Sequence, residues 1–164
     1  MTVLVAYATH SGATRTLAET IAEALVGAGL PAVAADVADD PDPGARSAVV
    51  AGSAVRAESL EKSFVRWTQR HDDALAAAPF ALFTCSGSAS DPAKKGRQKA
   101  LDRFLAQTPL TPVATRNLPG WVLFDRIPAH EQLLLRSMRT PTGDFRDLDA
   151  TAAWAVEIAP LLRG

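Results

Sequence analysis

Short apolar runs alternate with segments of helical period along almost the whole chain, and this alternation most constrains the fold. The runs cover residues 2–7, 31–37, 47–52, 79–85 and 111–116. They are short and rich in β-branched or small apolar residues, which is typical of strands buried on both faces. Because strands and helices take turns, the pattern predicts a doubly wound α/β three-layer sandwich with a five-stranded parallel sheet.

The segments between the runs repeat apolar residues every three or four positions. The repeated residues are Leu17, Ile21 and Leu25 in the first predicted helix, and Leu60, Phe64 and Trp67 in the second. Further helices are predicted over 93–106, 129–139 and 149–162. Asp147 or Asp149 is expected to cap the last of them. Trp67 and Trp154 fall on apolar helix faces, so we expect both in the core.

Length and charge limit the classes of function. The 164 residues, 48% of them apolar, suit a single domain over 1–164. Seventeen basic and 18 acidic residues give a net charge of −1, so no overall field attracts nucleic acid. The single cysteine excludes an internal disulfide and a cysteine-based metal site. No leader pattern or long apolar run is present, which predicts a cytoplasmic protein with at most peripheral membrane contact.

The turn "THSGAT", residues 9–14, joins the first predicted strand to the first helix. Its single glycine and lack of lysine exclude the common ATP-binding and dinucleotide-binding loops. Thr9, Ser11 and Thr14 place three hydroxyls at a helix N-terminus, where backbone N–H groups and the helix dipole favour an anion. The residues therefore predict a site for a phosphate monoester held without a cation. The alternative is a polar turn that simply starts a helix well.

The spacing T-x-S-G-x-T after the first strand resembles the phosphate loop of the flavodoxin family. The segments "VVAGSAVRAESLEKSFVRW" and "VLFDRIPAHEQLLLRSMRTPTGDFRDLDATAAWAVEIA" are similar to the flavodoxin-type, menaquinone-dependent protoporphyrinogen oxidases. This resemblance implies a flavoprotein with flavin mononucleotide (FMN) as cofactor and an oxidoreductase activity. It assigns the FMN phosphate to Thr9, His10, Ser11, Gly12, Ala13 and Thr14. It assigns the flavin ring to Ser53, Ala54, Val55 and Arg56 after the third strand, and to Ser86, Gly87 and Ser88 after the fourth.

Two other roles remain open. One is an electron carrier, although carrier flavodoxins are typically strongly acidic and this chain is almost neutral. The other is a binding module that has lost FMN, because neither "SAVRAES" nor "CSGSASDP" offers an aromatic ring for the flavin. The expected partner is a redox protein or a small molecule such as a porphyrinogen or quinone. Arg56 would approach the flavin N1–C2=O edge or bind an anionic substrate; the alternative is a solvated arginine at a helix start.

The sequence predicts a simple role for each of the remaining histidine, cysteine, tryptophan and arginine residues. His10 is the one histidine with a place beside a ligand, since His71 and His130 lie too far apart in the sequence to suggest a metal site. Cys85 reads as a small hydrophobe at a strand end, and Trp121 as a candidate lining residue. Four arginines are expected to be solvated: Arg126, Arg136, Arg139 and Arg146.

Overall fold

Strands and helices alternate along the chain as the sequence predicts. The structure is a computed structural model that describes residues 2–94, 96–137 and 143–164. The strands are β1 (Val3–Ala8), β2 (Ala32–Asp36), β3 (Val49–Arg56), β4 (Ser59–Leu60), β5 (Phe80–Ser86), β6 (Ala114–Pro119), β7 (Trp121–Val122) and β8 (Gly143–Asp144). The α-helices are α1 (Ala13–Gly27), α2 (Lys62–Arg70), α3 (Asp72–Ala76), α4 (Lys99–Gln107), α5 (Ala129–Ser137) and α6 (Leu148–Ile158).

The central sheet has the order β2-β1-β3-β5-β6, and all four pairings along this path are parallel. The prediction of a doubly wound, five-stranded parallel sheet is therefore confirmed. The strand order reverses between β1 and β3, because β2 lies on one side of β1 and every later strand lies on the other. In such sheets ligands bind beyond the carboxyl ends of the strands at the reversal. The loop after β1 and the end of β3 meet at that place.

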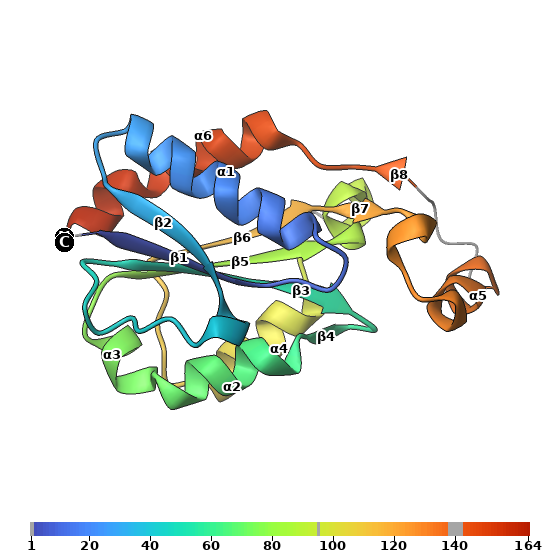
Figure 1. Cartoon of the computed structure of the whole chain (residues 1–164), viewed down its shortest axis with the longest axis horizontal. Coiled ribbons are helices and arrows are strands. Elements are labelled where there is room, and N and C mark those ends of the chain that lie inside the picture. The colour runs from blue at the N-terminus through green and yellow to red at the C-terminus, as the bar shows by residue number, and fades with distance from the viewer. Residues whose placement is uncertain (1, 95, 138–142) are drawn as a thin grey trace.

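Helices cover both faces of the sheet (Figure 1). Helices α1 and α6 pack together on one face, and α2, α3 and α4 lie on the other. Each face has its own buried core, with Trp154 in the first and Trp67 in the second, so both tryptophans are core residues as predicted. None of the helices in the described ranges has the length and apolar character to cross a membrane.

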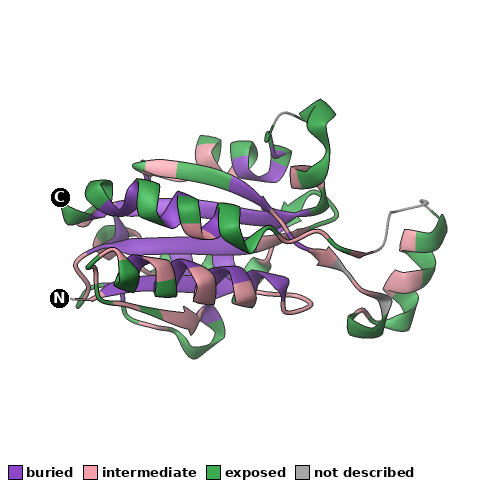
Figure 2. Ribbon diagram, turned by 90° about the horizontal axis from the view of Figure 1, so that it is seen from above, coloured by how far each residue is buried: buried purple, intermediate pink, exposed green. Residues whose placement is uncertain are grey.

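A long connection between β6 and α6 leaves the body of the sandwich. We call residues 121–147 the excursion. It carries the antiparallel pair β7–β8 and the helix α5, which lies beyond the carboxyl ends of the sheet strands (Figure 1) and is half-buried or exposed along its length (Figure 2). The predicted helix over 129–139 is confirmed as far as Ser137. Residues 138–142 lie outside the described ranges.

Three element boundaries differ from the prediction. The third strand runs on through Ser53–Arg56, because Ser53 and Ala54 still pair with β5, and it then turns back as β4, where Val55 pairs with Leu60 in an antiparallel ladder. The helix predicted over 93–106 begins only at Lys99, after two short 3-10 turns and the left-handed Gly96. The fifth strand begins at Ala114, later than predicted. Asp147 caps α6 by accepting a hydrogen bond from the Ala150 N–H at 2.9 Å.

The β3–β4 turn holds two non-glycine residues in the left-handed region. Ala57 has φ 49° and Glu58 has φ 57°, as a two-residue type I′ hairpin requires. We predict that the double variant Ala57→Asn/Glu58→Gly raises the free energy of unfolding by about 1 kcal/mol, because both new residues adopt this conformation readily. Urea denaturation measures the change. Glu58→Gln, which keeps the strained backbone, serves as the control, and equal stability of the two variants would contradict the prediction.

Candidate functional site

The loop after β1 presents uncapped backbone N–H groups. Gly12 is the N-cap of α1 with φ 98°, and no side chain caps the first turn of the helix. The Gly12 N–H donates to Thr9 Oγ1 at 2.9 Å, which closes the loop on itself. The first N–H groups of a helix have no partner within the helix, and α1 has no acidic residue in its first turn. The loop therefore has the form of an anion site.

The loop also carries three hydroxyl groups. Thr9 Oγ1 accepts from the Gly12 N–H, and Ser11 Oγ accepts from the indole N–H of Trp121 at 3.1 Å. An accepting hydroxyl can still donate, so both oxygens are fixed, while neither O–H group donates to a residue within 2–94, 96–137 or 143–164. Thr14 is 1% exposed; among the described residues its Oγ1 has no oxygen or nitrogen partner, and the Cys85 thiol lies beside it. A phosphate monoester fits this donor set.

Trp121 lies against this loop. Its indole N–H donates to both the carbonyl oxygen and the hydroxyl of Ser11, at 3.2 and 3.1 Å. A Cβ atom on Gly12 would lie 3.1 Å from Cζ2 of Trp121. The glycine therefore serves both a left-handed backbone and a close ring contact. Trp121, predicted as a lining residue, therefore contacts the loop after β1 through Ser11 and Gly12.

Two arginines stack on Trp121. The guanidinium carbons of Arg126 and Arg146 lie 4.9 and 4.3 Å from the ring centroid, within the range of a cation–π contact. Arg146 also donates to both carboxylate oxygens of Asp144, at 2.8 and 2.6 Å, and to Thr16 Oγ1 at 3.0 Å. These bonds hold the pKa of Asp144 below its ordinary value. The sequence predicts a loop without a cation, whereas the fold brings two guanidinium groups beside it.

The expectation that the four C-terminal arginines are solvated is wrong for Arg146, which is held by several bonds. Arg126 is exposed but stacks on the indole. Arg136 is exposed, and Arg139 lies outside the described residues.

The end of β3 is the first half of the predicted ring site. Ser53 is buried, and its hydroxyl donates to the Ala54 carbonyl and accepts from the Glu61 N–H. That hydroxyl is therefore committed to the turn into α2. Ala54 and Val55 are half-buried, and Arg56 is exposed at the strand end. Its guanidinium faces Glu131 of α5 at 2.6 Å and Glu61 at 3.7 Å.

The end of β5 is the second half, and its serines belong to a buried polar network. Thr84 and Ser86 donate to Asn117 Oδ1, at 2.9 and 2.8 Å, and Asn117 Nδ2 donates to Ser88 Oγ at 3.3 Å. Gln98 donates to the same Ser88 oxygen at 2.8 Å, and the Ser86 and Ser88 hydroxyls lie 3.0 Å apart. The Ser88 hydrogen is then used on Ser86. A ligand would therefore meet the exposed backbone at Gly87 rather than these hydroxyls.

A cavity of about 500 Å³ lies between the β3–β4 turn and the segment that follows β5. Its walls are Val55, Ala57, Glu58, Ser86, Gly87, Ser88, Ala93, Lys94, Arg97, Gln98, Lys99 and Asp102. Among its charged residues, Lys99 lies 3.9 Å from Glu58 and Arg97 lies 3.8 Å from Asp102. The cavity joins the two strand ends that the sequence assigns to the flavin ring.

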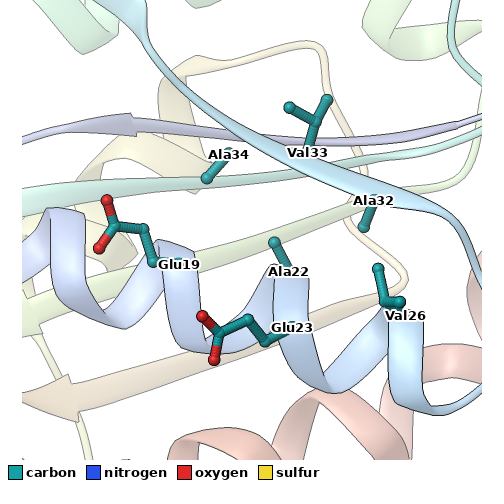
Figure 3. A pocket seen from close by; sticks show the side chains of 7 residues that line it. All are labelled: Glu19, Ala22, Glu23, Val26, Ala32, Val33 and Ala34. Atoms are coloured by element: carbon teal, nitrogen blue, oxygen red, sulfur yellow. The ribbon is translucent and has the colours of Figure 1, made fainter.

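A second hollow lies at the far edge of the sheet, between α1 and the edge strand β2 (Figure 3). Its lining is mostly alanine and valine, with Glu19 and Glu23 on the helix side. It lies away from the carboxyl ends of the strands and brings no set of polar groups to a point, so it is a poor candidate for a ligand site. No group of three or more potential metal ligands occurs in the part of the chain that the structure describes.

Cys85 lies beneath the site and is an inert thiol. It is 6% exposed, and its sulfur fills the space where Gly120 lacks a side chain. Burial raises the pKa of the thiol to about 11, although the Thr14 hydroxyl and the charge of Arg146 act in the opposite direction. The reading of Cys85 as a small buried hydrophobe is confirmed.

We predict that Cys85 reacts at least about 100-fold more slowly with a thiol reagent in the native protein at pH 8 than in urea. In the folded state the reagent cannot reach the buried sulfur easily, and only a small fraction of the thiol is ionised to the reactive thiolate. Absorbance of released thionitrobenzoate measures the rate. Equal rates with and without urea would show that the segment around Cys85 opens freely.

Sequence reasoning missed three residues of this region. Asn117 could have been found from the sequence, because a polar residue at the end of a buried strand needs a hydrogen-bond partner. Glu131 and Arg146 could not have been found in this way, since both reach the site from the excursion, far along the chain from the loop after β1. Only the tertiary structure brings them to it.

The strand order and the loop after β1 define a doubly wound α/β protein with an uncapped, hydroxyl-bearing helix start at the carboxyl end of its first strand. A family model for the flavodoxin domain matches residues 4–149. The chain belongs to this family, whose members bind FMN. A search of curated protein sequences gives no match.

Solved structures share the fold. An archaeal flavodoxin is 15% identical, with a TM-score of 0.63 and 100% of both chains covered. Flavodoxin 1 from Bacillus cereus is also 15% identical, with a TM-score of 0.61 and 98% of both chains covered. Rubredoxin oxygen:oxidoreductase from Desulfovibrio gigas is 14% identical, with a TM-score of 0.56; the match covers 99% of this chain and 35% of that one.

Proposed function

We propose that this chain is an FMN-dependent redox protein that holds the flavin phosphate in the loop Thr9–Thr14. The bound flavin would carry the electrons, and the protein would position it. The observation that carries the proposal is the uncapped start of α1 at Gly12, with the Thr14 hydroxyl in the first turn of that helix. The O–H groups of Thr9 and Ser11 complete a donor set for a phosphate dianion.

The flavin ring would lie between the end of β3 and the loop after β5, in the cavity of about 500 Å³. In this arrangement Ala54 and Val55 offer apolar surface, Gly87 offers exposed backbone, and Arg56 offers a guanidinium. Ser53, Ser86 and Ser88 would support the two walls from below through their internal hydrogen bonds. Their predicted role in cofactor binding is therefore indirect.

The test is a comparison of FMN with riboflavin, which lacks the phosphate. We expect the triple variant Thr9→Ala/Ser11→Ala/Thr14→Ala to lose at least about 100-fold in FMN affinity, because each hydrogen bond to a charged group contributes about 1.5 kcal/mol or more. Riboflavin affinity should change little. Quenching of flavin fluorescence on titration with the protein measures both constants.

Thr20→Ala is the matched control, since Thr20 only donates to the Thr16 carbonyl within α1. Retained FMN affinity in the triple variant would show that the phosphate is bound elsewhere. A wild-type protein that quenches neither flavin would refute the proposal and favour a binding module without FMN.

The charge of the cavity favours a second, finer function, the oxidation of an anionic small molecule. Lys94, Arg97 and Lys99 outnumber Glu58 and Asp102 around the cavity, and Lys94 has no ionic partner among the described residues. Such a lining suits a carboxylate-bearing substrate. The near-neutral net charge agrees with this role better than with a carrier that docks through an acidic surface.

Turnover separates the two roles. We would mix the FMN-loaded protein with protoporphyrinogen and a soluble quinone and follow porphyrin fluorescence. Oxidation faster than in a protein-free control, with a KM that rises in Lys94→Glu, would support the oxidoreductase. Reduction by a flavodoxin reductase without substrate oxidation would favour the electron carrier.

A further inference from the structure

Glu131 on α5 connects the two loops of the proposed flavin site. Its Oε2 lies 2.7 Å from Nε2 of His10, and its Oε1 accepts from Arg56 Nη1 at 2.6 Å. The side chains of His10, Glu131 and Arg56 are 24%, 20% and 48% exposed. Three elements that are distant in sequence thus place an imidazole, a carboxylate and a guanidinium together between the phosphate loop and the end of β3.

The geometry selects the tautomer of His10. A lone pair on Nε2 would repel the carboxylate oxygen 2.7 Å away, so Nε2 carries the hydrogen and donates to Glu131. Arg56 Nη1, at 3.1 Å from the same nitrogen, then serves the other carboxylate oxygen. The neutral imidazole consequently keeps its lone pair on Nδ1, and no described residue donates to that atom.

The fixed side-chain charges beside His10 are net negative, and a phosphate bound in its loop would add to them. Burial alone would raise the pKa of Glu131, but the bonds and charges of His10 and Arg56 outweigh burial and hold that pKa below its ordinary value. Glu131 is therefore ionised at neutral pH. Arg56 faces Glu131 and Glu61, so these three fixed charges sum to −1. His130 is the other titratable group beside Glu131, at 3.9 Å, and is itself highly exposed.

We propose that His10 is the proton-accepting group of the flavin site and that Glu131 is its positioning residue. This inference rests on the proposed function. When bound, FMN would supply the redox chemistry: with two electrons from a donor and one proton, its ring would carry a negative charge. Nδ1 of His10 takes a second proton from solvent to balance that charge and releases it when an acceptor removes the electrons. The protein thus exchanges two electrons and two protons in each cycle.

The first experiment counts protons. FMN-loaded wild type and His10→Gln, matched for bound flavin by absorbance, are reduced electrochemically in weakly buffered solution at pH 7.5 with a pH indicator. We expect the wild type to take up as much as one proton more per flavin than His10→Gln. Glu131→Gln should fall between the two, because Nε2 keeps a partner but loses the charge. His130→Gln should match the wild type.

A second experiment observes the imidazole itself. The sequence has three histidines. In the double variant His71→Gln/His130→Gln, the histidine ring C–H resonances in a proton NMR spectrum therefore come from His10 alone. Reduction at pH 7.5 should move these resonances toward their protonated positions. Equal proton uptake in wild type and His10→Gln, or resonances unmoved by reduction, would overturn the inference. Absence of FMN binding would instead refute the proposed function before either measurement.

Discussion

Gly52→Ala is expected to lower the free energy of unfolding by about 3 kcal/mol, the upper end of what overpacking in a core usually costs. A Cβ atom at this position would overlap Cζ and both Cε atoms of Phe83 on the neighbouring strand. The ring cannot move away easily, because Phe83 is fully buried and packs edge-on against Trp154 with centroids 6.3 Å apart. The strands β3 and β5 would have to separate just below the proposed ring site.

Urea denaturation with Gly27→Ala as control tests this expectation. A Cβ atom on Gly27 meets nothing within 4 Å, and alanine favours the helix, so that variant should be slightly more stable than wild type. Phe83→Leu should remove the steric overlap that Gly52→Ala creates. The double variant should therefore lose less free energy of unfolding than the two single variants lose together. Additive losses would show that the ring is not the obstacle.

The parallel sheet could be predicted from the sequence, because its strands are short apolar runs and helices lie between them. The sequence could not show that β3 continues past Gly52, because Ser53 and Ala54 fit a loop equally well. What keeps them in the strand is their pairing with Thr84 and Cys85 of β5. Likewise Trp121 could be assigned to a site but not to the phosphate loop, since its place depends on the indole N–H reaching Ser11.

The phosphate end was easier to predict than the ring end for a physical reason. A loop between a strand and a helix can form an anion site from its own backbone and hydroxyls, and this is the site proposed for Thr9–Thr14. The ring end is assembled from β3, the segment after β5 and α5, and its polar contacts run between them. Whether Ser86 binds a ligand or a neighbouring side chain depends on Asn117, which no local pattern links to it.

Asn117→Leu is therefore the most informative change at the ring end, and we expect it to lower the free energy of unfolding by about 3 kcal/mol. Asn117 accepts from the buried hydroxyls of Thr84 and Ser86 and donates to Ser88. Leucine leaves two buried donors without an acceptor, and each unsatisfied group costs about 1–3 kcal/mol. The loop after β5 should loosen as well, so FMN affinity should fall together with stability.

Arg116→Ala is the matched control on the same strand, because Arg116 only meets the exposed Glu157 at 3.4 Å, and exposed pairs contribute less than about 1 kcal/mol. Denaturation in urea gives the stabilities, and amide hydrogen exchange at residues 86–90 reports the loop directly. We expect faster exchange in Asn117→Leu alone. If Asn117→Leu is no less stable than Arg116→Ala, the hydroxyls have found other acceptors, and the network does not hold the loop in place.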